Sequence, residues 1–439
     1  MKNKITFVYS FLAIISSQIF AQTAQQDTTL ERMKTRTSFA KMYIGLDFQQ
    51  TQGGSTQYIT PRGTVADANF GASTTPRFLI GGTHFWGHAD FYVAFNIAKP
   101  MGQALPNADF TKLNINRGVE LGLHYYPMAI KVGTIRPYIG LGLQSFNYYQ
   151  GSKAKDIDYT TIPQISKNYF PFHAGLTYAS PMFLFKIGAE YQTQTEFKYA
   201  ISRVSDGNLK LNPFTINASM KFWFNSNAGL ATKAGLSSVK RGLNTLSKYH
   251  KLNAFYVGIG PSGSLQMSPS GYVNDKYPFL SRERRGGSIT DLTAGYYLHK
   301  PDMNIGLSYR NIRSSNSGYD ALLRFQRKSY MLETYKFLGD YHGFVPFVGP
   351  TLAYEDLAMT DTDKGKSQTF TDKKIALGII LGWDIRLTRS EWWILRTNLR
   401  YTPNLHFKAE GKKVMFDDLE FNFIQFTFFP ERLMAFKKK

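Results

Sequence analysis

Histidines are the first candidates for chemistry in this sequence, because imidazole can act as a metal ligand and as a proton carrier near neutral pH. The chain has eight of them. His84 and His88 are spaced i, i+4, but the glutamate of a helical HExxH metal motif is missing, and the segment reads as a short turn. The other histidines are scattered, so the spacing predicts no metal site and no catalytic residue. A Ser/His/acid group assembled by the fold stays open.

Two glycine-containing or acidic motifs resemble ligand-binding loops without the rest of the required pattern. Gly258–Gly263 matches GxGxxG, but no helix begins after it, so no helix N-terminus would face a pyrophosphate. The run that starts at Asp361 resembles a calcium loop but carries two lysines and lacks the downstream acid, which predicts a solvated outer loop. The absence of cysteine excludes disulfides, Cys-ligated metal and a Cys nucleophile. We therefore expect no enzymatic activity and no cofactor, with a lipid-modifying enzyme as a third-ranked alternative.

The strong positive charge is the feature with most functional content. Lys and Arg number 52 against 31 Asp and Glu, a net charge of +21. Arginine offers a fork of donors that matches phosphate oxygens, and lysines inside a pore favour anions. A role in solubility alone remains the alternative. The candidate contacts for anions or glycolipid phosphate are three residues in a predicted outer loop and two at inward strand positions: Arg282, Arg284, Arg285, Lys186 and Lys221.

The N-terminus predicts export. A short basic start is followed by an apolar stretch from Phe7 to Phe20 and then a polar segment, as in a secretory signal peptide ending at Ala21. Residues 22–40 are expected to form a periplasmic N-terminal segment. No later stretch has 18 consecutive apolar residues, so a membrane crossing would require a closed barrel, whose strands satisfy their own backbone hydrogen bonds.

Short alternating runs separated by turn residues fill the rest of the chain. In Phe214–Phe222 every even position is apolar and every odd one polar, which predicts a strand with one apolar and one polar face. We predict eight such strands in each half, joined by alternating long and short connections. This alternation is typical of an up-and-down membrane barrel with tight periplasmic turns and long outer loops.

The two halves also repeat each other in order, about 210 residues apart, which predicts a tandem duplication. Met42–Leu46 recurs as Phe255–Ile259, and Pro137–Gly140 as Pro346–Gly349. Two further matches fall between these and after them: Asp90–Phe95 with Asp302–Leu307, and Leu184–Lys186 with Ile394–Arg396.

Apolar-Gly-apolar triplets such as Ile44-Gly45-Leu46 and Val257-Gly258-Ile259 identify a resemblance. Each half resembles the small eight-stranded outer-membrane-protein β-barrel family (porin-like). The resemblance implies an all-β, transmembrane, antiparallel up-and-down barrel. It implies architecture and no single activity, since that family includes narrow pores, adhesins and structural anchors.

The chain therefore divides into a unit at 41–224, a basic amphipathic helical linker at 225–251, a unit at 252–429 and a basic tail at 430–439. Leu236, Val239, Leu243 and Leu246 define the apolar face of the linker helix. We predict two tandem eight-stranded barrels, with one 16-stranded barrel as the alternative. Glycines at inward positions suit a crowded lumen: Gly45, Gly140, Gly142, Gly258 and Gly306.

The function predicted from the sequence is that of an integral barrel protein in the outer membrane of a Gram-negative cell, forming a narrow porin-like channel with a preference for anions. The alternative is a non-conducting structural or accessory subunit of an outer-membrane secretion, assembly or adhesion complex. Expected partners are outer-membrane lipid, surface glycolipid and proteins of such a complex, and no nucleic acid.

Overall fold

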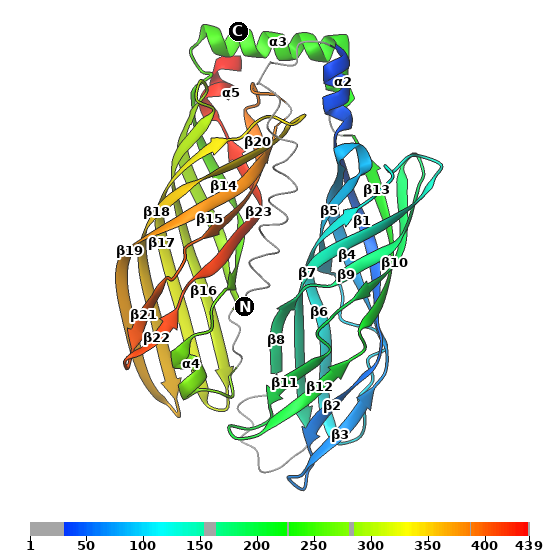
Figure 1. Cartoon of the computed structure of the whole chain (residues 1–439), viewed down its shortest axis with the longest axis vertical. Helices are drawn as coiled ribbons and strands as arrows, with labels where there is room; N and C mark the ends of the chain where they lie inside the picture. The colour runs from blue at the N-terminus through cyan, green and yellow to red at the C-terminus, as the bar shows by residue number, and fades with distance from the viewer. Residues whose placement is uncertain (1–29, 153–163, 226–227, 281–284, 387, 438–439) are drawn as a thin grey trace.

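A computed structural model describes residues 30–152, 164–225, 228–280, 285–386 and 388–437. It contains two closed antiparallel β rings that stand side by side, with three helices gathered at one end (Figure 1). We call this end of both barrels the helix end and the opposite end the far end. The predicted signal peptide lies outside the described residues.

The first ring has eight strands and is closed by pairing of its first and last members. In ring order these are β1 (Lys41–Thr51), β4 (Ser73–His84), β5 (Ala89–Asn96), β6 (Phe110–Tyr125), β7 (Ile135–Ser152), β9 (Phe172–Ala179), β10 (Phe183–Tyr191) and β13 (Phe214–Phe224). Its far-end connections contain β2 (Gly54–Ile59), β3 (Val65–Phe70), β8 (Gln164–Tyr169), β11 (Glu196–Ala200) and β12 (Asp206–Leu211). Four of these inserted strands form their own sheet, in the order β11-β12-β2-β3.

The second ring also closes with eight strands, which confirms two small barrels over one large barrel. Its strands are β14 (Ala254–Gln266), β15 (Arg285–Leu298), β16 (Met303–Gly318), β17 (Ala321–Phe337), β18 (Phe344–Asp363), β19 (Lys366–Ile385), β20 (Trp393–Tyr401) and β23 (Asp418–Phe428). Its far-end connections carry α4 (Gly271–Lys276) and the hairpin of β21 (His406–Ala409) and β22 (Lys412–Met415).

The helix end carries α2 (Leu30–Ser38), α3 (Lys233–Lys248) and α5 (Pro430–Lys437), together with the short turns η1 (Phe85–Gly87) and η2 (Ala228–Ala231). Helix α3 begins where Thr232 caps it by accepting a 3.0 Å hydrogen bond from the Gly235 N–H. Its apolar face points toward the protein, with Leu246 fully buried, and its basic side chains are exposed. In the described part of the chain, no helix is both long and apolar enough to cross a membrane.

The strands place their apolar side chains outside and their polar side chains inside. In β13, Ile216 and Met220 are each 46% exposed, whereas Thr215, Asn217 and Lys221 are at most 1% exposed. The same order holds along β1, where Leu46 and Phe48 are exposed and Asp47 and Gln49 are buried. A water-soluble sheet would bury its apolar face, so this wall is built to face lipid.

The predicted alternation of long and short connections is wrong at two places in the second barrel, because the ring strands continue through residues 311–323 and 356–369, where it predicts long loops. β16 joins β17 through Tyr319-Asp320, and β18 joins β19 through Lys364-Gly365. All four turn residues have positive φ angles, between 48° and 78°, as a type I′ hairpin turn requires. Asp361, predicted in a solvated loop, is 4% exposed inside the far end of β18.

The physical reason is an inversion of the hydropathy pattern where the wall leaves the membrane. Near the middle of β17, Tyr330 and Leu332 point outward. Toward the far end of the same strand, Leu323 and Phe325 point inward and Arg324 points outward. The side chains therefore still alternate, but the apolar ones face lipid in one part of the strand and the lumen in the other. In the sequence this change of face looks like the end of a strand.

Two finer features of the rings bear on the sequence. The register of β23 with β14 shifts between Ile259 and Ser262, so β23 has a bulge between Asn422 and Phe426. The four repeated segments fall on the first, third, fifth and seventh strands of each ring. Gly45 and Gly306 face crowded interiors, since an added Cβ would approach the Met220 carbonyl oxygen to 2.5 Å and the Tyr256 hydroxyl to 2.5 Å.

Candidate functional site

The lumen of the first barrel is crossed by a buried ion-pair network centred on Arg77. Its guanidinium donates to Asp47 at 2.6 Å and to Glu120, and lies 3.7 Å from Glu190. Glu190 also accepts from Gln49 and other lumenal amides. These side chains come from β1, β4, β6 and β10, so the network ties walls that are not adjacent in the ring.

A chain of four titratable groups lies beside this network, nearer the helix end. Asp90 is 3.2 Å from His124 Nδ1, His124 Nε2 is 3.1 Å from His173 Nδ1, and His173 Nε2 is 3.3 Å from Glu120. Lys221 donates to Asp90 at 2.8 Å. The chain links an acid on β5 to an acid on β6 through two imidazoles, and all its members are at most 3% exposed.

Glu120, His173 and Glu190 offer three ligand atoms within 4.8 Å of one another, a spacing that could hold a metal ion. Both carboxylates, however, already face the Arg77 guanidinium, and Glu190 accepts from Asn217 at 2.8 Å. A cation placed here would lie beside Arg77, so the arrangement fits an ion-pair network better than a metal site.

The second lumen contains a denser network built on arginines. Arg327 binds Glu355 through two hydrogen bonds of 2.9 and 2.6 Å. Arg400 donates to Glu333 and to Asp291, both at 2.6 Å. The remaining two lumenal arginines also face carboxylates: Arg396 binds Asp384 at 2.7 and 3.0 Å, and Arg310 lies 2.6 Å from Glu420.

The two networks are close to neutral. The first contains four cationic residues, Arg77, Arg117, Lys186 and Lys221, and four acids, Asp47, Asp90, Glu120 and Glu190. In the second, four arginines (Arg310, Arg327, Arg396 and Arg400) face five acids, Asp291, Glu333, Glu355, Asp384 and Glu420. The large positive charge of the chain therefore lies outside these networks, and neither network carries an excess of positive charge.

Apolar layers close both far ends. In the first barrel the inserted strands form a core with the ends of β6 and β7: Tyr58, Ala68, Phe70, Phe110, Leu113, Ile115, Phe146, Tyr148, Ile165, Tyr169, Phe197, Tyr199, Ile201, Leu209 and Leu211. In the second, residues around α4 pack against β17, β18 and the β21–β22 hairpin. Tyr272 and Tyr277 both donate to Asp361, and burial together with these hydrogen bonds raises the pKa of each phenol.

The helix end of the second barrel is closed by side chains of the chain itself. Tyr297, Phe337, Phe347 and Phe429 belong to one buried cluster. Arg432 of α5 lies 4.2 Å from the ring centre of Phe429, and burial lowers the pKa of this guanidinium to about 10. A solute would have to displace both end layers and the ion pairs between them to cross this barrel.

The residues singled out from the sequence have different locations. Lys221 and Lys186 lie in the first lumen, where Lys221 pairs with Asp90 and Lys186 lies over the rings of Tyr92 and Tyr138. Arg282 and Arg284 lie outside the described residues. Arg285 begins β15, and its backbone pairs opposite Leu265. A phosphate contact by any of the five therefore remains a prediction.

Sequence reasoning missed the lumenal arginine and carboxylate residues. Their signal was present, because Arg396 and Arg400 occupy alternate positions of one strand whose other face is apolar. Alternation shows that such residues point inward, but only the register shows which acid each one meets.

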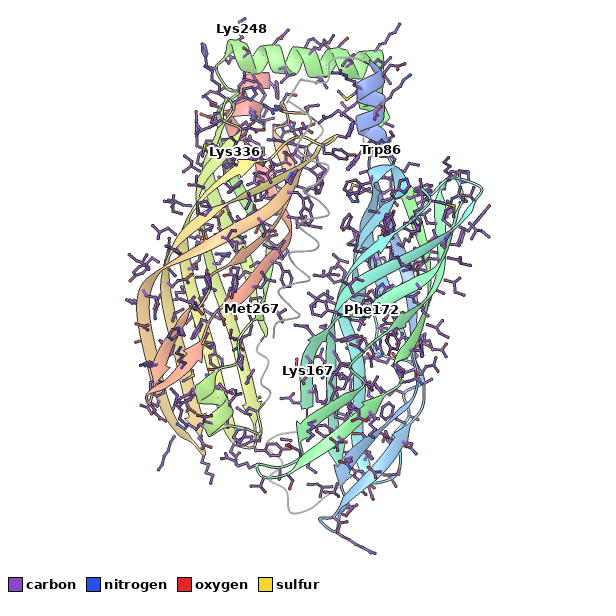
Figure 2. All side chains as sticks on the ribbon, in the orientation of Figure 1. Trp86, Lys167, Phe172, Lys248, Met267 and Lys336 are labelled. Atoms are coloured by element: carbon purple, nitrogen blue, oxygen red, sulfur yellow. The ribbon has the colours of Figure 1, made fainter. Side chains whose placement is uncertain are left out.

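The two barrels contact each other at both ends. At the helix end, Arg36 of α2 pairs with Asp340 at 3.0 Å, and Trp86 packs on His342 with ring centres 4.9 Å apart (Figure 2). At the far end, Arg203 donates to Asp363 at 2.6 Å and to the Tyr319 carbonyl oxygen at 2.8 Å. The hydrogen bond to Asp363 raises the pKa of Arg203.

No protein-family model matches the chain, and no curated protein matches its sequence. Among solved structures it is similar to Neisserial surface protein A, with 14% identity and a TM-score of 0.29 over 39% of this chain and 94% of that one. The outer membrane protein AlkL matches with 14% identity and a TM-score of 0.31, over 47% and 94%. An outer membrane channel from Pseudomonas putida F1 matches with 10% identity and a TM-score of 0.20, over 88% and 95%. The closed rings and lipid-facing walls make the chain an integral outer-membrane β-barrel protein.

Proposed function

We propose that the chain is a non-conducting double-barrel scaffold of the outer membrane. The observation that carries the proposal is the filling of both lumens by paired charges between apolar end layers. An eight-stranded ring leaves an interior about wide enough for its own side chains. Each buried ion pair would need its partners rehydrated or replaced before a solute could pass, which costs several kcal/mol per ion.

The contacts between the barrels support a scaffold role further. A hydrogen-bonded ion pair joins the barrels at each end, and aromatic packing adds to the one at the helix end. Two anchors held at both ends present a fixed spacing on either side of the membrane, as an accessory subunit of a secretion, assembly or adhesion complex requires. We also infer that the two barrels arose by duplication, because the repeated segments occupy strands of the same ordinal position.

The alternative function is the narrow, anion-preferring channel predicted from the sequence. It would require both ion-pair networks to open. Its preference for anions would also require the side chains of Lys186 and Lys221 to be accessible to a solute. Lys221 is instead held by Asp90.

Ion flux from vesicles separates the two functions. The folded chain is reconstituted into vesicles that contain a chloride-sensitive dye, beside vesicles that contain an open porin as the positive control. The scaffold proposal expects chloride release no faster than from protein-free vesicles. Release that approaches the porin rate, from protein shown to be folded, would contradict it.

A further inference from the structure

The outward faces of β16, β17 and β18 change chemistry at one level of the second barrel wall. Three leucines lie opposite one another across these strands: Leu307, Leu332 and Leu352. The next outward positions toward the far end are all tyrosines, Tyr309, Tyr330 and Tyr354, whose ring centres are 5.1 and 6.4 Å apart in sequence order. Rows of aromatic side chains mark the boundary between hydrocarbon and headgroups in membrane barrels.

Cationic side chains lie on the outward face directly beyond this tyrosine row. Toward the far end, Lys328 is the next outward residue after Tyr330 on β17, and Lys373 is the next after Ile375 on β19. Arg313 is the second outward residue beyond Tyr309 on β16, and Arg324 is the second beyond Lys328 on β17, both toward the far end. We call these four residues the girdle patch. The register places one acid, Asp356, between Lys328 and Lys373, whereas Arg313 and Arg324 lie opposite the uncharged Gln326 and Thr360.

Two strands of the first barrel differ at this level. The outward face of β1 ends with Phe48 and Gln50, and that of β13 begins with Phe214 and Ile216. Its apolar wall passes directly into uncharged polar residues on these strands. On β1 and β13, therefore, the first barrel carries no charge at the level where the second barrel carries the girdle patch.

We infer that the far end faces the cell exterior. Helices α2, α3 and α5 and both described chain ends lie at the helix end, and the inserted strands, α4 and the extended hairpins lie at the far end (Figure 1). In outer-membrane barrels the short turns face the periplasm and the longer loops face outward. The girdle patch thus lies at the headgroup level of the outer leaflet, on the side of the wall and below the tips of the hairpins.

We propose that the girdle patch binds the phosphate groups of a phosphorylated glycolipid in the outer leaflet. Arginine matches two phosphate oxygens with its fork of donors, and lysine adds a flexible point charge. The tyrosine and leucine rows below supply the apolar wall along which the acyl chains of the same lipid lie. This inference depends on the orientation of the barrel and is independent of whether the lumens conduct.

The test measures lipid retained by the purified, folded, full-length chain. The protein in a zwitterionic detergent is titrated with a diphosphorylated glucosamine-disaccharide lipid or with its dephosphorylated form, and bound lipids are counted by native mass spectrometry. We expect tighter binding of the phosphorylated lipid. Replacing all four girdle residues (Arg313→Gln, Arg324→Gln, Lys328→Gln and Lys373→Gln) should weaken that binding about tenfold or more.

The matched control removes the same number of charges at the helix end. Lys336 lies on the same outward face of β17 as Lys328, but toward the helix end (Figure 2). The control combines Lys336→Gln with changes at three other exposed lysines, Lys233→Gln, Lys240→Gln and Lys300→Gln. It should bind the lipid like the parent chain.

Three results would overturn the proposal. Equal binding of phosphorylated and dephosphorylated lipid would remove the phosphate from the interaction. An equal loss in the helix-end control would reduce the effect to net charge. Complete competition by inorganic phosphate at the lipid concentration would assign the patch to free phosphate. A heat-dependent shift in gel mobility confirms that each variant is folded, and the flux measurement on the same samples reports on the scaffold proposal separately.

Discussion

The two barrels have the same strand number and are filled in different ways. The first lumen combines Arg77 and Arg117 with lysines, histidines and tyrosines around its carboxylates, whereas the cations of the second network are all arginines, two of which bind a carboxylate through two hydrogen bonds. The first far end is closed by strands inserted into its loops, and the second by extended ring strands around a short helix. The comparison teaches that an eight-stranded ring needs filled volume and paired charge more than any particular set of residues.

The seventh strands give the largest expected difference between the barrels. Arg396 binds Asp384 twice, while Lys186, at the matching position of the first barrel, contacts the faces of Tyr92 and Tyr138. Arg396→Met leaves a buried carboxylate without its partner and should cost about 3–5 kcal/mol of unfolding free energy. Lys186→Met, which removes ring contacts, should cost about 1 kcal/mol or less. Guanidinium unfolding followed by tryptophan fluorescence measures both.

A double variant sharpens this prediction. Removing the arginine and its acid together, Arg396→Met with Asp384→Leu, should recover most of the lost stability, because no buried charge is left unpaired. Equal losses for Arg396→Met and Lys186→Met would show that the two networks do not differ as their geometry indicates.

The far-end closures give a smaller expected difference. Asp361→Asn removes the charge that accepts hydrogen bonds from two phenols and pairs with Lys276 at 3.1 Å. We expect the segment around α4 to lose about 1–3 kcal/mol of local stability. Hydrogen exchange should then accelerate at residues 271–280 and stay unchanged in the inserted strands of the first barrel. Acceleration in both barrels would contradict separate closures.

The contacts between the barrels should affect position more than stability. Arg36→Gln combined with Arg203→Gln removes one ion pair at each end, and the Arg203 pair is about one-third exposed, at 30% and 35%. An exposed pair contributes about 0.2–1 kcal/mol, so the unfolding midpoint should change little. Distances between spin labels, one on each barrel, should spread more widely in the double variant. An unchanged distribution would assign the spacing to other contacts.

The smallest effect concerns pH at the helix end. Glu431 of α5 accepts a 2.8 Å hydrogen bond from Lys251, which lowers the pKa of this carboxyl and raises that of Lys251. A carboxyl whose pKa is lowered by folding stabilises the folded state at pH values above its ordinary pKa of about 4.3. This stabilisation is lost as the pH falls through the lowered pKa. Protease cleavage near α5 should therefore increase slightly as the pH is lowered from 5 to 3, because the Glu431 carboxylate becomes protonated in this range. Glu431→Gln should abolish this pH dependence, and a dependence that survives would assign it elsewhere.

The strand pattern was predictable because one physical rule generates it. Alternation of apolar and polar residues in Phe214–Phe222 predicts a strand, and in the structure the apolar even-numbered residues face lipid. The far halves of the hairpins were missed because the rule reverses there. Beyond Tyr354, β18 buries Leu357 and Met359 and exposes polar residues to water, so a single-phase search ends the strand too early.

The candidate sites were less predictable than the fold. The inward direction of Lys221 follows from alternation, but its pairing with Asp90 depends on which strands lie across the lumen. The girdle patch was missed for the same reason, since Lys328 and Lys373 are far apart in sequence and are brought together by two hairpins.

Single-channel recording from the folded chain in a planar bilayer tests the central claim most directly. Protein of confirmed fold, held under a salt gradient and stepped through both voltage polarities, should give no discrete openings, because each lumen is filled along its length. Stable openings of uniform size would show that the networks part and would replace the scaffold with a channel, and the reversal potential would then report whether it prefers anions.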